Sequence, residues 1–150
     1  MTNRRELLQS GAAVLGAAAG LSPQAARAAW NQAAFEAQSL AAVVKALGGT
    51  AAAAESRQVQ LQAPEIAENG AVVRVSAASQ LPGTTQLAIV VEKNPNALAA
   101  VFELPSGTDA HLATNIKMAE TSKVYALAKV GDRYYYAAQQ VTVTLGGCGN

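Results

Sequence analysis

This 150-residue chain has one cysteine and one histidine, and these counts exclude several kinds of site. A structural zinc site of Cys and His ligands needs about four such residues, and an intrachain disulfide needs two cysteines. The sequence therefore predicts neither, and we expect no metal and no cofactor. The cysteine stands near the carboxyl end, in the run Gly146-Gly147-Cys148-Gly149-Asn150. Because glycine has the greatest backbone freedom and no side chain to pack, residues 146–150 are predicted to form a flexible arm that carries a thiol.

A thiol on such an arm favours a carrier over an enzyme. A nucleophilic enzyme holds its cysteine beside a base and an oxyanion donor, whereas a carrier needs a handle that other enzymes can reach. Three residues from Leu145 to Cys148 span at most ~11 Å. An exposed thiol has a pKa of about 8.5, so only a few per cent is thiolate at pH 7. We therefore expect no catalytic residue in this chain, and we expect the enzyme that loads Cys148 to activate it.

Two alternative functions use the same cysteine. An odd cysteine in an exported protein often forms an intermolecular disulfide, which would make the chain an interaction domain without a substrate. A thiol enzyme would instead pair Cys148 with His111, which is close in sequence to Asp109. A histidine in a surface loop is the simpler interpretation of His111.

The first 28 residues are typical of a cleaved export leader. They contain Arg4-Arg5, a weakly apolar run from Gly11 to Leu21 and a small-residue stretch that ends at Ala28. The paired arginines favour the twin-arginine export route over ordinary secretion. The apolar run of about eleven residues is shorter than the roughly 20 that a membrane-spanning helix needs. We therefore predict a periplasmic domain of residues 29–150 that has no membrane association, and export together with a folded partner that has no leader.

One helix and seven strands are predicted for the mature chain. Leu40, Val43, Val44 and Leu47 lie on one face of a helix over residues 31–47, and Gly48-Gly49 follow it. Beyond residue 58 the pattern changes to two-residue alternation and short apolar runs, which predict strands. The strand candidates are residues 58–62, 73–77, 86–91, 98–104, 112–118, 123–130 and 133–145. The sequence therefore predicts an all-β fold, an immunoglobulin-like antiparallel sandwich preceded by one helix.

The composition excludes one class of partner. Charged residues make up 14% of the chain and the formal net charge is +1. Without a basic surface, binding to nucleic acid is not expected.

Two of three further features have more than one interpretation. The run Tyr134-Tyr135-Tyr136 could stack on a ligand or lie at an interface. Alternation instead predicts that Tyr135 lies on the opposite sheet face from its neighbours, so that one face packs in the core and the other meets a partner. Gly131-Asp132 is a predicted hairpin turn. Lys117 and Glu120 either dock a partner or form surface ion pairs.

The arm and three upstream segments resemble the SoxY family, the sulfur-carrying subunits of bacterial thiosulfate oxidation. Family members end in Gly-Gly-Cys-Gly-Gly, which Gly146, Gly147, Cys148 and Gly149 match and Asn150 does not. The other similar segments are Pro64–Val73, the Lys93-Asn94-Pro95 turn and Ile116–Ser122.

The resemblance implies a mechanism and a set of partners. It implies that Cys148 is the covalent attachment site for sulfur intermediates and that the chain pairs with a small SoxZ subunit. It also implies transient contact with three enzymes. SoxAX, a haem enzyme, joins thiosulfate oxidatively to the cysteine sulfur, SoxB hydrolyses the terminal sulfonate off as sulfate, and a sulfur dehydrogenase oxidises the sulfane sulfur that remains.

Overall fold

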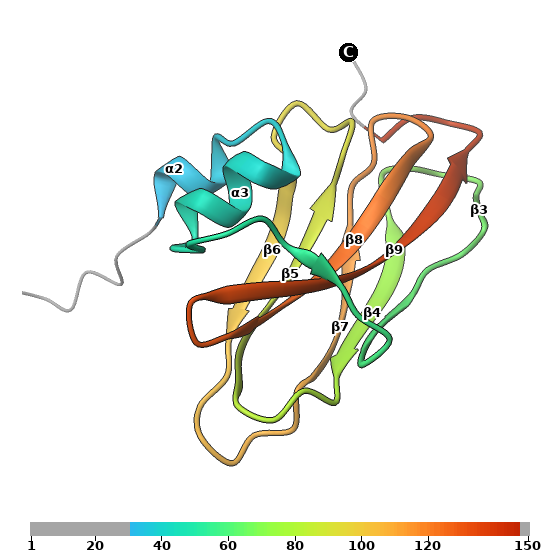
Figure 1. Cartoon of the computed structure of the whole chain (residues 1–150). Coiled ribbons are helices and arrows are strands. Elements are labelled where there is room, and N and C mark those ends of the chain that lie inside the picture. The colour runs from blue at the N-terminus through green and yellow to red at the C-terminus, as the bar shows by residue number, and fades with distance from the viewer. Residues whose placement is uncertain (1–30, 148–150) are drawn as a thin grey trace, which may run out of the picture. The chain divides into compact units, whose positions relative to one another are not determined.

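A computed structural model describes residues 31–147 (Figure 1). The predictions about Arg4 and Arg5, about cleavage after Ala28, and about Cys148 and Gly149 lie outside the described residues. Two short helices precede nine strands in this part of the chain. The helices are α2 (Gln32–Phe35) and α3 (Leu40–Ala46), and the strands are β1 (Ala54–Glu55), β2 (Val59–Gln62), β3 (Ile66–Ala67), β4 (Val73–Ser79), β5 (Thr84–Val91), β6 (Leu98–Glu103), β7 (His111–Ile116), β8 (Ser122–Val130) and β9 (Arg133–Val143).

The strands form two sheets, as an immunoglobulin-like sandwich requires. The larger sheet has the order β1-β9-β8-β5-β6, with β3 also paired to β9, and the smaller one has the order β2-β4-β7. Strands β8 and β9 form the predicted hairpin, in which Val130 pairs with Arg133 across Gly131-Asp132. Gly131 has a φ of 62°, which matches the glycine position of a tight hairpin turn with primed geometry. The seven predicted strands are all present.

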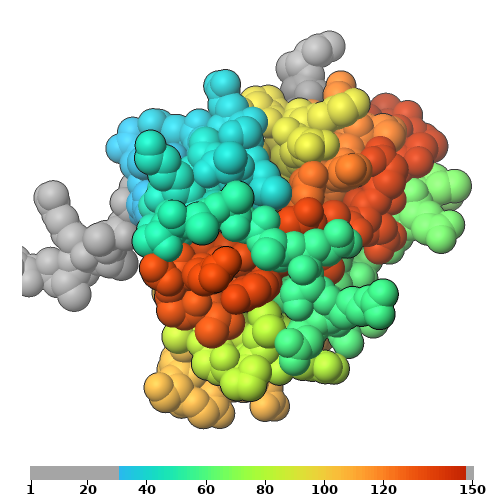
Figure 2. Space-filling view, in the orientation of Figure 1, coloured from blue at the N-terminus to red at the C-terminus, as the bar shows by residue number. Residues whose placement is uncertain are grey.

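Two apolar layers hold the described domain together. One lies between the sheets and contains, among others, Val75, Ile89 and Met118. The other lies on the outer face of the larger sheet, where the helices cover β5, β6 and β8. Strand β5 is buried along Gln86–Val91 because both of its faces are covered, as its nearly continuous apolar run predicts. In Figure 2, residues of β9 reach the surface beside the helical segment.

The predicted single helix over residues 31–47 is wrong in one respect, because the structure breaks it into two. The Asn31 side chain accepts a hydrogen bond from the backbone N–H of Ala34 and so caps α2. Ser39, which has an extended backbone, accepts one from Ala42 and caps α3. Such caps favour a new helix start over continuation. The predicted apolar face is confirmed, since Val43 and Val44 are buried.

The helical segment ends where the sequence predicts. Gly48 has a φ of 88°, and its N–H bonds to the carbonyl of Lys45 while that of Gly49 bonds to Val44. This pair of bonds is a Schellman motif, which ends a helix. None of the described helices is long and apolar enough to cross a membrane.

Strands β1 and β3 were missed by the sequence prediction, and the end of β9 was placed too late. Both short strands pair in parallel with one edge of β9, so the larger sheet is not wholly antiparallel. Strand β9 ends at Val143, although alternation predicted a packed strand as far as Leu145. The side chain of Leu145 is 64% exposed, because the chain turns toward a neighbouring loop after β9.

Candidate functional site: the root of the arm

We define the arm root as Leu145, Gly146 and Gly147, the described residues that precede Cys148. The arm root is hydrogen-bonded to two loops at one end of the sandwich. Gly70 donates its N–H to the carbonyl of Leu145 (2.7 Å), and its own carbonyl accepts from the N–H of Met118 (2.7 Å). The carbonyl of Met118 in turn accepts from the N–H of Gly147 (2.8 Å). These three bonds tie the arm to the sandwich up to the residue before the thiol.

The glycines at this junction allow backbones to approach closely. A Cβ on Gly147 would overlap the carbonyl group of Gly70, and one on Gly146 would overlap the carbonyl oxygen of Ala119. A Cβ on Gly70 would lie 2.7 Å from the nitrogen of Gly147. None of the three has a positive φ, so a larger residue is excluded here by space. The flexibility of the arm stays a prediction, and the structure adds a steric reason for Gly146 and Gly147.

The segment that receives Gly147 is anchored by its own side chain. Met118 is completely buried, and its side chain is part of the layer between the two sheets. Its backbone N–H and carbonyl are left to bind Gly70 and Gly147. A fixed point of the core therefore lies directly beneath the arm root.

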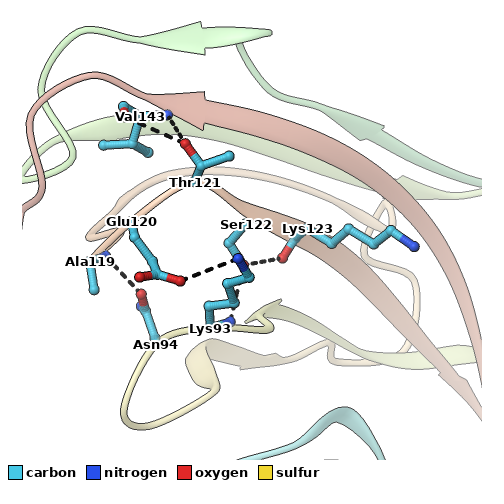
Figure 3. A network of polar contacts seen from close by, with 8 residues as sticks. All are labelled: Lys93, Asn94, Ala119, Glu120, Thr121, Ser122, Lys123 and Val143. Atoms are coloured by element: carbon cyan, nitrogen blue, oxygen red, sulfur yellow. Dashed lines mark hydrogen bonds and ion pairs between the residues drawn. The ribbon is translucent and has the colours of Figure 1, made fainter.

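A side chain from a third loop clamps the same segment (Figure 3). Asn94, between β5 and β6, donates from Nδ2 to the carbonyl of Lys117 (2.8 Å). Its Oδ1 accepts from the N–H of Ala119 (2.9 Å). One amide group thus spans Met118 and bonds the residue on either side of it.

Four further side chains form polar contacts close to this clamp. Ser122 is 1% exposed, and its hydroxyl accepts from the N–H of Lys93 (3.0 Å). The hydroxyl of Thr121 accepts from the N–H of Val143 (2.9 Å), at the last residue of β9. Nζ of Lys93 lies 3.3 Å from Oε1 of Glu120, with both side chains more than half exposed. Glu120 thus forms the surface ion pair that was one of its two interpretations. Such pairs contribute little to stability.

The segments singled out in the sequence meet at this end of the sandwich. Gly70 lies in the segment Pro64–Val73, Asn94 in the Lys93-Asn94-Pro95 turn, and Met118 in Ile116–Ser122, and all three segments are hydrogen-bonded into the surroundings of the arm root. Sequence reasoning offered a role only within Ile116–Ser122, where Lys117 and Glu120 either dock a partner or form surface ion pairs. In the structure, hydrogen bonds of the three segments hold the chain that leads to the thiol.

His111 is not brought to the arm root. It is the exposed first residue of β7, while Ile116 at the other end of that strand leads into Met118. At about 3.3 Å per residue, His111 lies roughly 17 Å from Ile116. No group of three or more metal-ligating side chains exists among residues 31–147. His111 is therefore remote from the arm root.

The tyrosine run confirms the predicted alternation. Tyr134 and Tyr136 pack in the layer beneath the helices, and Tyr135 packs in the layer between the sheets. The hydroxyl of Tyr134 lies 2.6 Å from Oε1 of Gln86 and is buried. Burial, reinforced by the negative charge of Glu103, raises the pKa of Tyr134 well above its usual value. This tyrosine is part of the core.

One open groove lies at the far end of the sandwich. It is bordered by residues 79–85 and by the loop 104–110, which lies at the bottom of Figure 1, opposite the loop between β5 and β6. The groove is thus remote from the arm root. We call the surface at the arm end, where Leu145 and Gly146 are exposed and Gly147 is half-buried, the rim of the sandwich.

The described residues form an immunoglobulin-like sandwich. The last of them are bound to its rim, directly before the only cysteine of the sequence. A comparison with protein families matches residues 44–148 to the family described as sulfur oxidation protein SoxY. The chain therefore belongs to the SoxY family of sulfur oxidation proteins. No match was found among the curated proteins.

A solved structure supports the same assignment. The sulfur carrier protein SoxY from Chlorobium limicola f thiosulfatophilum is 34% identical to this chain, with a TM-score of 0.55. The match covers 61% of this chain and 83% of that one. The all-β sandwich and the role in sulfur oxidation that the sequence implied are thereby confirmed.

Proposed function

We propose that this protein is a periplasmic carrier that holds sulfur intermediates covalently on Cys148 and presents them to successive enzymes of thiosulfate oxidation. One observation carries the proposal. The backbone is hydrogen-bonded to the rim of the sandwich as far as Gly147, and the chain's only thiol belongs to the next residue. The described backbone therefore ends at this rim, one residue before the thiol in the sequence.

The groups beside the arm root suit a passive carrier. The residues that bond to Gly147 and Leu145 do so through backbone atoms of Met118 and Gly70, which supply no base for a thiol. A general base must lie within hydrogen-bond reach of the proton it removes. The loading enzyme would therefore supply the base, and this chain would supply the handle.

The chemistry proposed for Cys148 has two balanced steps. In the first, the thiolate and the terminal sulfur of thiosulfate form an S–S bond and release two electrons to a haem enzyme similar to SoxAX. In the second, water attacks the sulfonate sulfur of the adduct in an enzyme similar to SoxB, which releases sulfate and two protons and leaves a persulfide anion on Cys148. A sulfur dehydrogenase would then oxidise the sulfane sulfur.

The proposal includes a partner and an export route. We propose that the mature chain, residues 29–150, forms a heterodimer with a SoxZ-like subunit that has no leader, and that Arg4 and Arg5 direct export of the folded pair. If Arg4 and Arg5 are both changed to Lys, the partner should no longer be exported. Normal export of the partner would contradict this.

Reconstituted thiosulfate oxidation tests the carrier role. The Cys148→Ser chain should bind its partner as the unchanged chain does and support no turnover. The control is His111→Ala, which should keep full turnover because His111 lies far from the arm root. Turnover by the Cys148→Ser chain would refute the proposal, and loss of turnover in the His111→Ala chain would favour a thiol enzyme.

A further inference from the structure

Asn94 makes two side-chain hydrogen bonds to one backbone segment, although it belongs to a surface turn. Asn94 lies in an exposed turn between β5 and β6, yet both polar atoms of its side chain bond to backbone groups of Lys117 and Ala119 (2.8 and 2.9 Å). An amide side chain supplies a donor and an acceptor at once. That is what the carbonyl of Lys117 and the N–H of Ala119 require.

The clamped backbone is the one on which the arm rests. Between the two clamped residues, the carbonyl of Met118 accepts from Gly147 (2.8 Å). The carbonyl of Ala119 lies so close to Gly146 that no Cβ fits there. Displacement of residues 117–119 would therefore remove both the bond and the surface that hold the arm root.

We propose that Asn94 is a positioning residue for the carrier reaction. It holds residues 117–119 so that Gly147 stays bonded to Met118 and Cys148 is presented from one place on the rim. The inference rests on the proposed carrier function, because it concerns how the thiol is offered to an enzyme. Asn94 acts through the backbone of the 117–119 segment, to which both of its side-chain hydrogen bonds are made.

The anchored root limits where the thiol can go. While Gly147 is bonded to Met118, the backbone is held as far as the residue before Cys148. When that bond is lost, the free segment begins after Leu145, and the reach to Cys148 grows to ~11 Å. A wider range lowers the local concentration of the thiol at an enzyme's entrance. Loss of Asn94 should therefore raise the KM of the loading enzyme for the carrier several-fold and leave kcat nearly unchanged.

The test compares three variants of the full mature chain bound to its partner subunit. Asn94→Ala removes both bonds of the clamp. Asn94→Asp keeps the acceptor for Ala119 and loses the donor to Lys117. The matched control is Asn96→Ala, two residues further along the same turn, where the asparagine is exposed.

Two measurements read the position of the arm. A nitroxide attached to Cys148 should give a more mobile spectrum in Asn94→Ala than in the unchanged chain, with Asn94→Asp intermediate and Asn96→Ala unchanged. Hydrogen exchange at the Gly147 amide should accelerate at least about five-fold in Asn94→Ala, which corresponds to the loss of one hydrogen bond. Exchange at Ala126 in the buried strand β8 should not change, which separates a local effect from general destabilisation.

The outcomes are decisive in both directions. If Asn94→Ala and Asn94→Asp match Asn96→Ala in both measurements, Asn94 does not position the arm and the proposal is overturned. If Asn94→Ala unfolds, the Asn94→Asp chain decides by the same criteria. Neither measurement requires a sulfur intermediate on Cys148, so a negative result here leaves the carrier function standing. Absence of sulfur adducts on Cys148 would contradict the carrier function and would not change these two measurements.

Discussion

The two ends of the sandwich use glycine for opposite physical reasons. At the end remote from the arm, Gly107 and Gly131 have φ values of 81° and 62°, and a Cβ on either would meet no heavy atom within 4 Å. At the arm end, Gly70 and Gly147 have no positive φ, and a Cβ on either would overlap neighbouring backbone. The first pair shapes turns, and the second lets three chain segments come together.

This difference supports the proposed site. Turn glycines only connect strands, whereas the crowded glycines at the arm end join the chain before Cys148 to Met118, a fully buried residue of the core. The arm end is therefore built to hold something in place. The glycines at the far end shape turns.

Truncation at the arm end should have the largest effect. Removing residues 146–150 should abolish thiosulfate turnover, and it should also lower the free energy of unfolding by about 1 kcal/mol, because the bond from Gly147 to Met118 is lost. Removing residues 148–150 alone should abolish turnover and leave the urea midpoint unchanged. Equal midpoints for the two truncations would show that the arm root does not stabilise the domain.

Replacing one glycine at each end by alanine tests the close backbone packing at the arm end. Gly70→Ala places a Cβ against the carbonyl of Met118, so we expect it to lower the free energy of unfolding by about 2–3 kcal/mol. Gly107→Ala has free space and only an unfavourable φ, which costs about 1 kcal/mol. Urea unfolding of both variants measures the difference. A larger loss for Gly107→Ala would reverse the contrast between the two ends.

The buried tyrosine outside the arm end should give a smaller effect, with a pH signature. Tyr134→Phe removes the hydrogen bond to Gln86 and should cost about 1 kcal/mol at pH 7. Because burial raises the pKa of Tyr134 in the folded chain, its neutral form stabilises the fold fully below the unfolded value of about 10. That contribution is lost as the pH rises above 10.

Unfolding free energies measured between pH 9 and 11 test whether stability falls as Tyr134 loses its proton. The unchanged chain should lose stability above pH 10 more steeply than Tyr134→Phe does. Burial and a hydrogen bond to Glu92 also raise the pKa of Tyr125. The Tyr134→Phe chain should therefore still lose some stability above pH 10. Identical slopes in both chains would rule out the contribution of Tyr134.

The smallest effect is expected at the exposed ion pair of the arm end. Lys93→Ala should change the free energy of unfolding by less than about 0.5 kcal/mol, because both partners are more than half exposed. The backbone N–H of Lys93, which bonds to Ser122, is kept in this variant. Thermal unfolding of the unchanged chain and of Lys93→Ala, each in low and high salt, measures the contribution of the ion pair. A loss above about 1 kcal/mol would show that the pair has a structural role at the arm end.

Much of the fold follows from local patterns in the sequence. Alternation at Val73 and Val75 and the continuous run at residues 86–91 predict strands that the structure confirms. Strands β1 and β3 have only two residues each and form because β9 has a free edge, so no local sequence pattern predicts them. The break between α2 and α3 had a signal, since Ser39 is a good cap.

The site was predictable in its chemistry and less so in its geometry. The position of Cys148 among glycines predicts a carrier thiol. Glycine has the same sequence signature in a free arm and in a close backbone contact, and only the tertiary structure shows that Gly147 packs against Gly70. The bond from Asn94 to Lys117 spans 23 residues, which periodicity and spacing cannot reveal.

The most direct test of the account is intact-protein mass spectrometry of the exported chain, purified without reductant from cells given thiosulfate. The account predicts a mass increase that matches thiosulfate or added sulfur atoms, that maps to Cys148 and that a reductant removes. The same preparation of Cys148→Ser should carry no adduct. An unmodified thiol, or only a stoichiometric disulfide to one other subunit, would contradict the carrier function and favour an interaction domain.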